Sequence, residues 1–266
     1  MGMLTGVELN GASATIDQVK ALALTNYGHF TSMLVERGRV RGLSLHMQRL
    51  SRDCRQLFGT DLDTDRVRQH VRHALGSGGP TTVVRITVFD PALDLGTIGH
   101  DATPHVLVTT RPVGSGSGSP LRLRSASHQR EMPSVKHIGL FGALHQRRTA
   151  QREGYDDVLF LNPDGSISEI ATSNIGFVRS GRVVWPESAC LAGVTMTLLN
   201  QALDEPVATE SLTLGDLEGI DAAFATNAAT GVRAVASVDS TTWSSTVNPV
   251  LGGLRDLYAD IPAEVV

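Results

Sequence analysis

Lysine is the residue that this 266-residue chain most conspicuously lacks. Among its 23 basic residues only Lys20 and Lys136 are lysines, and all the others are arginines. A genome that favours arginine codons removes lysine wherever either cation suffices, so a lysine that remains is a candidate for chemistry that arginine cannot perform. A lysine amine can lose its proton and become a nucleophile or form a Schiff base, whereas a guanidinium stays charged.

Other absences narrow the class of protein. The two cysteines, Cys54 and Cys190, form neither a CxxC nor a Cys/His metal pattern and exclude a disulfide framework. No apolar run is long enough for a signal peptide or a membrane span. A net charge of −4 argues against a nucleic-acid coat, and the nine histidines show no metal-ligand spacing. We therefore expect a soluble cytoplasmic protein with no nucleic-acid partner, no membrane partner and no metal site.

Composition and turn signals indicate two globular domains. Hydrophobic residues make up 41% and charged residues 19% of the chain, which excludes a disordered or coiled-coil protein. Residues 113–120 read VGSGSGSP and have almost no side chains to pack, as is typical of a flexible linker. We predict a small N-terminal domain at 1–114, a linker at 115–120 and a larger domain at 121–266.

The periodicity of apolar residues indicates an α+β fold. Helices are expected at 42–58, from a cap at Asp63 or Thr64 to Gly76, at 140–152 and at 194–203. Strands are expected at 81–89, 105–110, 121–125, 158–161, 166–170, 175–178, 182–185 and 222–226. Because these do not alternate as βαβ units, and GxGxxG, P-loop and GxSxG strings are absent, a Rossmann or barrel fold is not expected.

Lys136 is the first candidate functional residue. It lies in MPSVKHIG at 132–139, among apolar residues and after a proline that favours extended backbone. Burial there would lower the pKa of its ammonium and favour the neutral, nucleophilic amine. The alternative is a solvent-facing lysine at the start of a helix.

Glu169 is the second candidate. In DGSISEI at 164–170, strand alternation places Ile167 and Glu169 on the same face. If Ile167 points inward, so does the carboxylate, which then needs a cationic partner. The alternative is a solvated face with Ile167 exposed.

Three further features are candidates for binding an anion. Arg49 offers bidentate donors to a phosphate, or forms a surface ion pair with Asp53 four residues on. Gly193-Val194-Thr195 opens a helix, whose free amides and threonine hydroxyl form either an anion site or a plain cap. The loop at 226–231 offers amides in the same way, or is a simple turn.

Taken in order, these elements resemble the pyridoxal-phosphate-dependent class IV aminotransferases, also called fold type IV. The resemblance spans roughly residues 20–240. It is carried by HMQRL at 46–50, Lys136, GYDD at 154–157, DGSISE at 164–169, NIGF at 174–177, LAGVT at 191–195 and FATNAA at 224–229. It implies a two-domain fold with a small N-terminal α/β domain and a larger C-terminal mixed α/β domain.

The resemblance also implies a role for each candidate toward pyridoxal 5'-phosphate. Lys136 is the Schiff-base lysine and shuttles a proton, and Glu169 keeps the pyridine nitrogen protonated. The phosphate is bound by Arg49, Val194, Thr195 and Ala228. The substrate is contacted by Phe30, Arg85 and Ala229.

The implied reaction transfers an amino group between an amino acid or amine and a 2-oxo acid in a homodimer. Two alternatives remain open, a 4-amino-4-deoxychorismate lyase that eliminates pyruvate and a non-catalytic homologue that acts as a binding module. Branched-chain members carry a tyrosine five residues after the lysine, where this chain has Phe141, and no Arg-x-His string follows Phe89. The resemblance therefore implies neither a branched-chain nor a D-amino-acid substrate.

Overall fold

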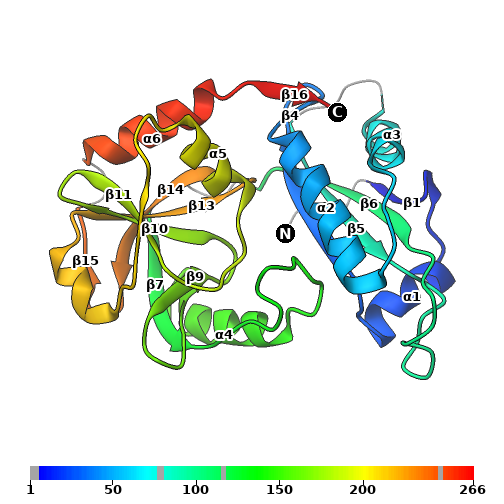
Figure 1. Cartoon of the computed structure of the whole chain (residues 1–266), viewed down its shortest axis with the longest axis horizontal. Helices are drawn as coiled ribbons and strands as arrows, with labels where there is room; N and C mark the ends of the chain where they lie inside the picture. Colours follow the sequence, from blue (N-terminus) through cyan, green and yellow to red (C-terminus); the bar gives the residue numbers. More distant parts are fainter. Residues whose placement is uncertain (1–5, 77–80, 115–117, 245–247) are drawn as a thin grey trace. The chain divides into compact units, whose positions relative to one another are not determined.

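Two units make up the computed structural model, which describes residues 6–76, 81–114, 118–244 and 248–266 (Figure 1). Unit 1 comprises Met1–Ser115, Val135–Gly139 and Pro262–Val266, and unit 2 comprises Gly116–Ser134 and Leu140–Ile261. Two short segments from the second half of the chain thus belong to unit 1, and one of them carries Lys136. Residues 115–117 of the predicted linker lie outside the described residues, and the predicted domain limits remain predictions.

Unit 1 contains a five-stranded antiparallel sheet with the order β2-β1-β6-β5-β3. Its strands are β1 (Gly6–Leu9), β2 (Ala12–Ser13), β3 (His29–Val35), β5 (Thr82–Phe89) and β6 (His105–Pro112). A separate antiparallel pair joins β4 (Arg39–Arg41) to β16 (Ala263–Val265). The helices are α1 (Ile16–Leu24), α2 (Leu43–Phe58) and α3 (Thr64–Leu75).

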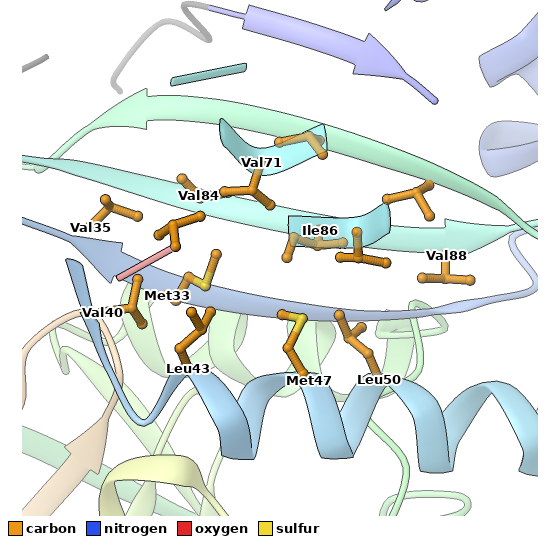
Figure 2. Close-up of a cluster of buried hydrophobic side chains, with 14 of the residues drawn as sticks. Met33, Val35, Val40, Leu43, Met47, Leu50, Val71, Val84, Ile86 and Val88 are labelled. Atoms are coloured by element: carbon orange, nitrogen blue, oxygen red, sulfur yellow. The ribbon is translucent and has the colours of Figure 1, made fainter. Parts of the chain in front are cut away.

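The core of unit 1 lies between the sheet and the helices α2 and α3. Helix α2 begins after Gly42 and ends before Gly59, both in the left-handed conformation that glycine adopts without strain. Its apolar residues recur every three or four positions and pack against β3 and β5 (Figure 2). The Asp63 side chain caps α3 by accepting from the amides of Asp65 and Arg66, as predicted.

Alternation along the strands divides the residues of unit 1 between the two faces of the sheet. Val106 and Val108 of β6 belong to the cluster under α2 and α3, whereas Leu107 packs with Ala21 of α1. In β3, Thr31 and Met33 therefore face α2, and Phe30 faces the other way. This alternation places the candidate side chains of β3 on defined faces.

Unit 2 contains a nine-stranded sheet with the order β12-β11-β10-β13-β14-β7-β8-β9, in which β15 pairs with β14. The strands are β7 (Leu121–Ser127), β8 (Asp157–Leu161), β9 (Ile167–Ile170), β10 (Asn174–Arg179), β11 (Arg182–Pro186), β12 (Ala208–Glu210), β13 (Ala222–Asn227), β14 (Gly231–Val238) and β15 (Thr241–Thr242). The helices are α4 (Phe141–Arg152), α5 (Val194–Ala202), α6 (Pro249–Asp260) and a short 3-10 helix (Leu214–Gly219).

Both faces of this sheet are covered. One face packs Leu159 of β8 with Phe177 of β10 in the largest apolar cluster of the unit. On the other face Phe160 packs with α4, and Phe224 of β13 packs with α5 and α6. Parallel pairing of β7 with β8 and with β14 among otherwise mostly antiparallel strands makes the sheet mixed.

The expected helices and strands are present, with ends that differ by one or two residues. The mixed α+β class is confirmed. Elements without a strong periodic signal, such as β3, β14 and α6, were not predicted. Within the described ranges, every helix is too short or too polar to cross a bilayer.

Candidate active site

Helix α2 carries a buried polar stripe beside its apolar one. His46, Arg49 and Asp53 are three and four residues apart, so they lie along one line of the helix. Their exposed fractions are 0%, 7% and 0%. The alternative of a surface ion pair between Arg49 and Asp53 is wrong, because both side chains are buried and Asp53 pairs with Arg52 at 2.7 Å.

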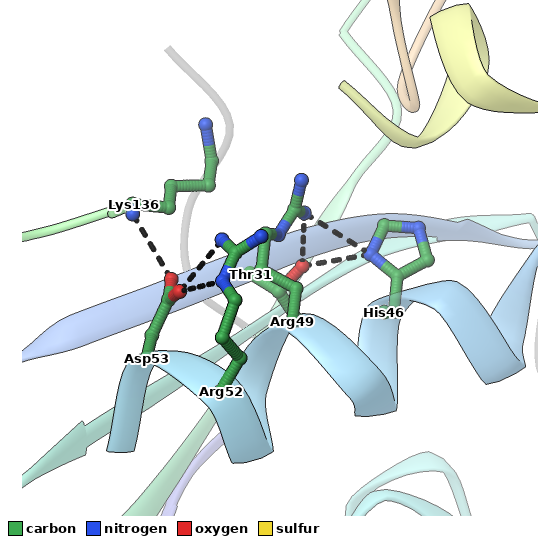
Figure 3. A network of polar contacts seen from close by, with 6 residues as sticks. All are labelled: Thr31, His46, Arg49, Arg52, Asp53 and Lys136. Carbon is green, nitrogen blue, oxygen red and sulfur yellow. Dashed lines mark hydrogen bonds and ion pairs between the residues drawn. The ribbon is translucent and has the colours of Figure 1, made fainter. Parts of the chain in front are cut away.

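A hydrogen-bond chain orients the Arg49 guanidinium. Arg49 Nη2 donates to Thr31 Oγ1 at 2.5 Å, and Thr31 Oγ1 lies 2.7 Å from His46 Nδ1 (Figure 3). Thr31 Oγ1 thus accepts from arginine and also contacts the His46 ring, so one buried hydroxyl joins these two side chains of α2. The guanidinium is therefore held in a fixed direction.

Burial sets the charge of each group in this chain. It lowers the pKa of His46 well below its ordinary value, and the positive charges of Arg49 and Lys136 act in the same direction. Burial also lowers the pKa of Arg49 to about 10, against the opposing effect of Asp53. At neutral pH the imidazole is therefore neutral and the guanidinium is charged.

Lys136 lies in an extended segment that runs beside β3. The amide of Phe30 donates to the Lys136 carbonyl at 2.8 Å, and the amide of Ile138 donates to the Gly28 carbonyl at 3.0 Å. The amide of Lys136 itself donates to Asp53 Oδ2 at 3.0 Å. Lys136 is half-buried, which corrects the alternative of a solvent-facing lysine at a helix start.

Phe30 links Lys136 to a second cation. Lys136 Nζ lies 4.8 Å from the centre of the Phe30 ring, and the Arg85 guanidinium carbon lies 3.7 Å from it. Arg85 Nε also donates to Thr87 Oγ1 at 3.2 Å, and burial lowers the pKa of Arg85. In unit 1, the cationic groups of Lys136 and Arg85 thus both lie close to the Phe30 ring. Arg49 lies on α2 of the same unit.

In unit 2 the carboxylate of Glu169 is buried with a cation. Arg130 Nη1 donates to Glu169 Oε1 at 3.0 Å, and the two side chains are 10% and 8% exposed. Ile167 on the same strand is fully buried. The prediction of an inward carboxylate with a cationic partner is confirmed, and the alternative of a solvated face is wrong.

The N-terminus of α5 is built to receive an anion. Its N-cap, Gly193, supplies no side-chain cap, and Val194 and Thr195 in the first turn are buried. Thr195 Oγ1 and, in β13, Thr226 Oγ1 are buried and have no hydrogen-bond partner within the described part of the chain. Both hydroxyls and the free amides of the first turn of α5 are therefore donors without an acceptor among the described residues.

Asn174 of β10 connects these two threonines. It pairs with Thr226 in the β10–β13 register and donates from Nδ2 to the Leu191 carbonyl at 2.7 Å. A Cβ on Gly193 would lie 2.1 Å from Asn174 Oδ1, so only glycine fits there. Asn174 therefore fixes the loop that leads into α5.

The loop after β13 is already partly hydrogen-bonded. Asn227 Oδ1 accepts from the amides of Ala229 and Thr230, each at 3.0 Å, in an Asx turn. The expectation that the Ala229 amide is available to a ligand is therefore wrong in this conformation. Ala228, which precedes it, is half-buried.

Sequence reasoning missed Thr31 and Arg130, and it named Asp53 only as a surface partner of Arg49 and Thr226 only as the first residue of a candidate anion loop. Arg130 lies six residues before Lys136, and Asp53 lies four residues after Arg49, so both are close in sequence to candidate residues. Their partners are 39 and 83 residues away in sequence, and only the fold brings them together. In the described ranges no group of His, Cys, Asp or Glu side chains is placed to hold a metal ion.

The fold is that of the fold type IV aminotransferases. The branched-chain aminotransferase of the thermophilic archaeon Thermoproteus uzoniensis, solved with norvaline, is 22% identical, with a TM-score of 0.82 over 97% of this chain and 94% of that one. A hypothetical aminotransferase from Mycobacterium tuberculosis in its PLP-bound form is 18% identical, with a TM-score of 0.80 over 97% of this chain and 98% of that one. The chain belongs to the class IV aminotransferase family, whose model matches residues 28–238.

Curated relatives carry aminotransferase names. A probable branched-chain-amino-acid aminotransferase of Rickettsia bellii is 34% identical over 40% of this chain. The branched-chain-amino-acid aminotransferase of Pseudomonas aeruginosa is 24% identical over 74% of this chain and 70% of its own length. The chain spans 37% of the Rickettsia protein and 43% of the branched-chain-amino-acid aminotransferase-like protein 2 of Arabidopsis thaliana.

Proposed function

We propose that this chain is a pyridoxal-phosphate-dependent aminotransferase that moves an amino group between an amino acid or amine and a 2-oxo acid. The observation that carries the proposal is the setting of Lys136, a half-buried lysine whose main chain is hydrogen-bonded to Phe30 and to Asp53 and whose amine lies over the Phe30 ring. Membership of the class IV aminotransferase family supports the same reaction.

The residues present fit the cofactor. A phosphate monoester accepts hydrogen bonds, and the buried hydroxyls of Thr195 and Thr226 and the uncapped amides of α5 are donors that need an acceptor. Arg49, charged and held by Thr31, supplies a cation. Val194 and Ala228 are proposed to contribute their backbone amides.

Pyridoxal 5'-phosphate, when bound, supplies an aldehyde for amines and an electron-withdrawing ring that stabilises negative charge on the substrate carbon. Lys136 Nζ would be the nucleophile toward this aldehyde. The same Nζ would accept and return the proton of the substrate carbon.

Glu169 keeps a proton on the pyridine nitrogen of the cofactor. A carboxylate does this only while it is ionised, and burial alone would favour its neutral form. Arg130, at 3.0 Å, offsets that cost. The Arg130 guanidinium therefore compensates the burial of the Glu169 carboxylate.

Arg85 and Phe30 are proposed to contact the substrate. Arg85 carries a positive charge next to the ring over which Lys136 Nζ lies, and a guanidinium recognises carboxylates. Ala229 keeps a proposed role toward the substrate that does not depend on its amide. The branched-chain substrates named for the relatives are not carried over to this chain. The homodimeric state and the pyruvate-eliminating lyase alternative remain to be tested.

Reductive trapping tests the proposal. The protein is incubated with pyridoxal phosphate, treated with borohydride and mapped by peptide mass spectrometry. We expect a pyridoxyl label at Lys136, and the variant Lys136→Ala should lose both the label and the visible absorption band. Lys20→Ala is the matched control and should keep both, because Lys20 is exposed and pairs with Asp17. A label at Lys20, or at neither lysine, would sink the proposal.

A further inference from the structure

We infer that Asp53 is the positioning residue for Lys136, acting on its main chain rather than on its amine. The inference deepens the proposed function and rests on it for the role of Lys136. Asp53 Oδ2 accepts the amide proton of Lys136 at 3.0 Å, across 83 residues of sequence. In Figure 3 the lysine side chain extends away from the carboxylate, so this contact involves the main chain and not the amine.

The carboxylate is itself rigidly held. Asp53 lies on the buried stripe of α2 and is 0% exposed. Its Oδ1 accepts from Arg52 Nε at 3.0 Å and Arg52 Nη2 at 2.7 Å, so both donors of Arg52 meet one carboxylate oxygen and the other oxygen serves Lys136. The place of Asp53 on α2 directs Oδ2 at the Lys136 amide.

The segment 135–139 needs this support because it is a short edge segment. It contacts β3 through the Phe30 and Ile138 hydrogen bonds and the bridge between His29 and His137. Such a segment has no strand of its own and opens easily when its few hydrogen bonds break. A hydrogen bond to a charged acceptor is stronger than one to a carbonyl, so the Asp53 contact is the strongest of the set.

Variants of Asp53 can separate its role as a hydrogen-bond acceptor from the effect of its negative charge. Asp53 needs its acceptor oxygen to hold the amide, and a neutral amide side chain offers the same oxygen. Asp53→Asn therefore keeps the contact with Lys136 while it removes the negative charge. Asp53→Leu has a similar volume and removes the acceptor. Arg52→Gln removes the half-exposed cation that pairs with Asp53 and leaves the Asp53 carboxylate in place as the acceptor.

Two readouts test the inference in these variants. The first is hydrogen exchange of the Lys136 amide in the protein without added cofactor. We expect exchange at least ~10-fold faster in Asp53→Leu, and within ~3-fold of the parent in Asp53→Asn and Arg52→Gln. The second is the rate of pyridoxyl labelling of Lys136, expected to fall by ~10-fold or more in Asp53→Leu alone, because small misplacements of a reacting group are costly.

Each outcome is decisive. A Lys136 amide that stays equally protected in Asp53→Leu, or equal labelling rates, would overturn the inference while leaving the proposed function intact. If the parent is not labelled at Lys136, the proposed function fails, and the amide exchange still reports on the contact. Should Asp53→Leu not fold, Asp53→Asn decides the matter, because loss of amide protection there would contradict a role that needs only the acceptor.

Discussion

At the scale of single residues, the site depends on polar groups whose burial is matched by a defined partner. Arg49 is held by Thr31, Asp53 by Arg52, and Glu169 by Arg130. A buried charge without a partner is neutralised or expelled, so each pair keeps its anion or cation available at neutral pH. The hydroxyls of Thr195 and Thr226 are among the buried polar atoms of the described residues that have no hydrogen-bond partner, and we propose that they bind the cofactor phosphate.

Glu169→Gln should separate cofactor binding from turnover. The amide has nearly the same shape, so the cofactor stays bound, but it does not stabilise a positive charge on the pyridine nitrogen. We expect turnover to fall by about 10²-fold or more, measured as the steady-state rate with saturating cofactor. Arg130→Gln is the partner variant, in which Glu169 takes up a proton more readily and activity is lost most at low pH. Near-normal turnover in Glu169→Gln would refute the role.

These residues also show which parts of the candidate site could be predicted from the sequence and which could not. Lys136 and Glu169 were singled out from a missing residue type and from strand alternation, both of which are local signals. Asp53 and Arg130 carry ordinary local signals, and their importance comes from contacts with residues 83 and 39 positions away. Spacing on a helix indicated that Arg49 and Asp53 share a face, but it did not indicate that the face is buried.

At the scale of elements, β3 and α2 position the first half of the site. Strand β3 alternates Thr31 toward α2 and Phe30 toward Arg85, and α2 presents its polar stripe to β3. The strong periodicity of α2 was readable from sequence, whereas β3 was not predicted although it carries Phe30. Its residues mix aromatic, polar and apolar types on both faces because both faces are buried.

His29, the first residue of β3, should make unit 1 sensitive to acid. Burial lowers the pKa of His29 to about 4, against the opposing charge of Asp53. The unfolded chain then binds more protons than the folded one between about pH 6.5 and 4, so stability is complete above this range and is lost as pH falls through it. The loss amounts to about 3 kcal/mol in the free energy of unfolding.

The measurement is the urea unfolding midpoint as a function of pH, in the parent and in His29→Leu. We expect a shallower fall between pH 6.5 and 4 in His29→Leu, and His46, also buried and neutral, accounts for part of the slope that remains. His100→Leu, at an exposed turn, is the control and should follow the parent. Parallel curves for the parent and His29→Leu would contradict the assignment.

At the scale of the whole molecule, the chain belongs to the class IV aminotransferase family and has the fold of its solved neighbours. The order of short motifs along the sequence predicted both the family and the fold, because each motif marks a local element that carries a candidate site residue. The substrate was not predictable in the same way. We propose that it depends on side chains such as Arg85 and Phe30, whose packing is set by neighbouring strands.

The reaction itself is the central claim, and a half-reaction measures it most directly. The protein loaded with pyridoxal phosphate is mixed with single L-amino acids, D-amino acids and amines, without a 2-oxo acid, and the cofactor and products are analysed. The account predicts that at least one donor converts the cofactor to pyridoxamine phosphate with an equal amount of its oxo product, and that Lys136→Ala does not. Pyruvate release from 4-amino-4-deoxychorismate with no pyridoxamine phosphate from any donor would contradict it.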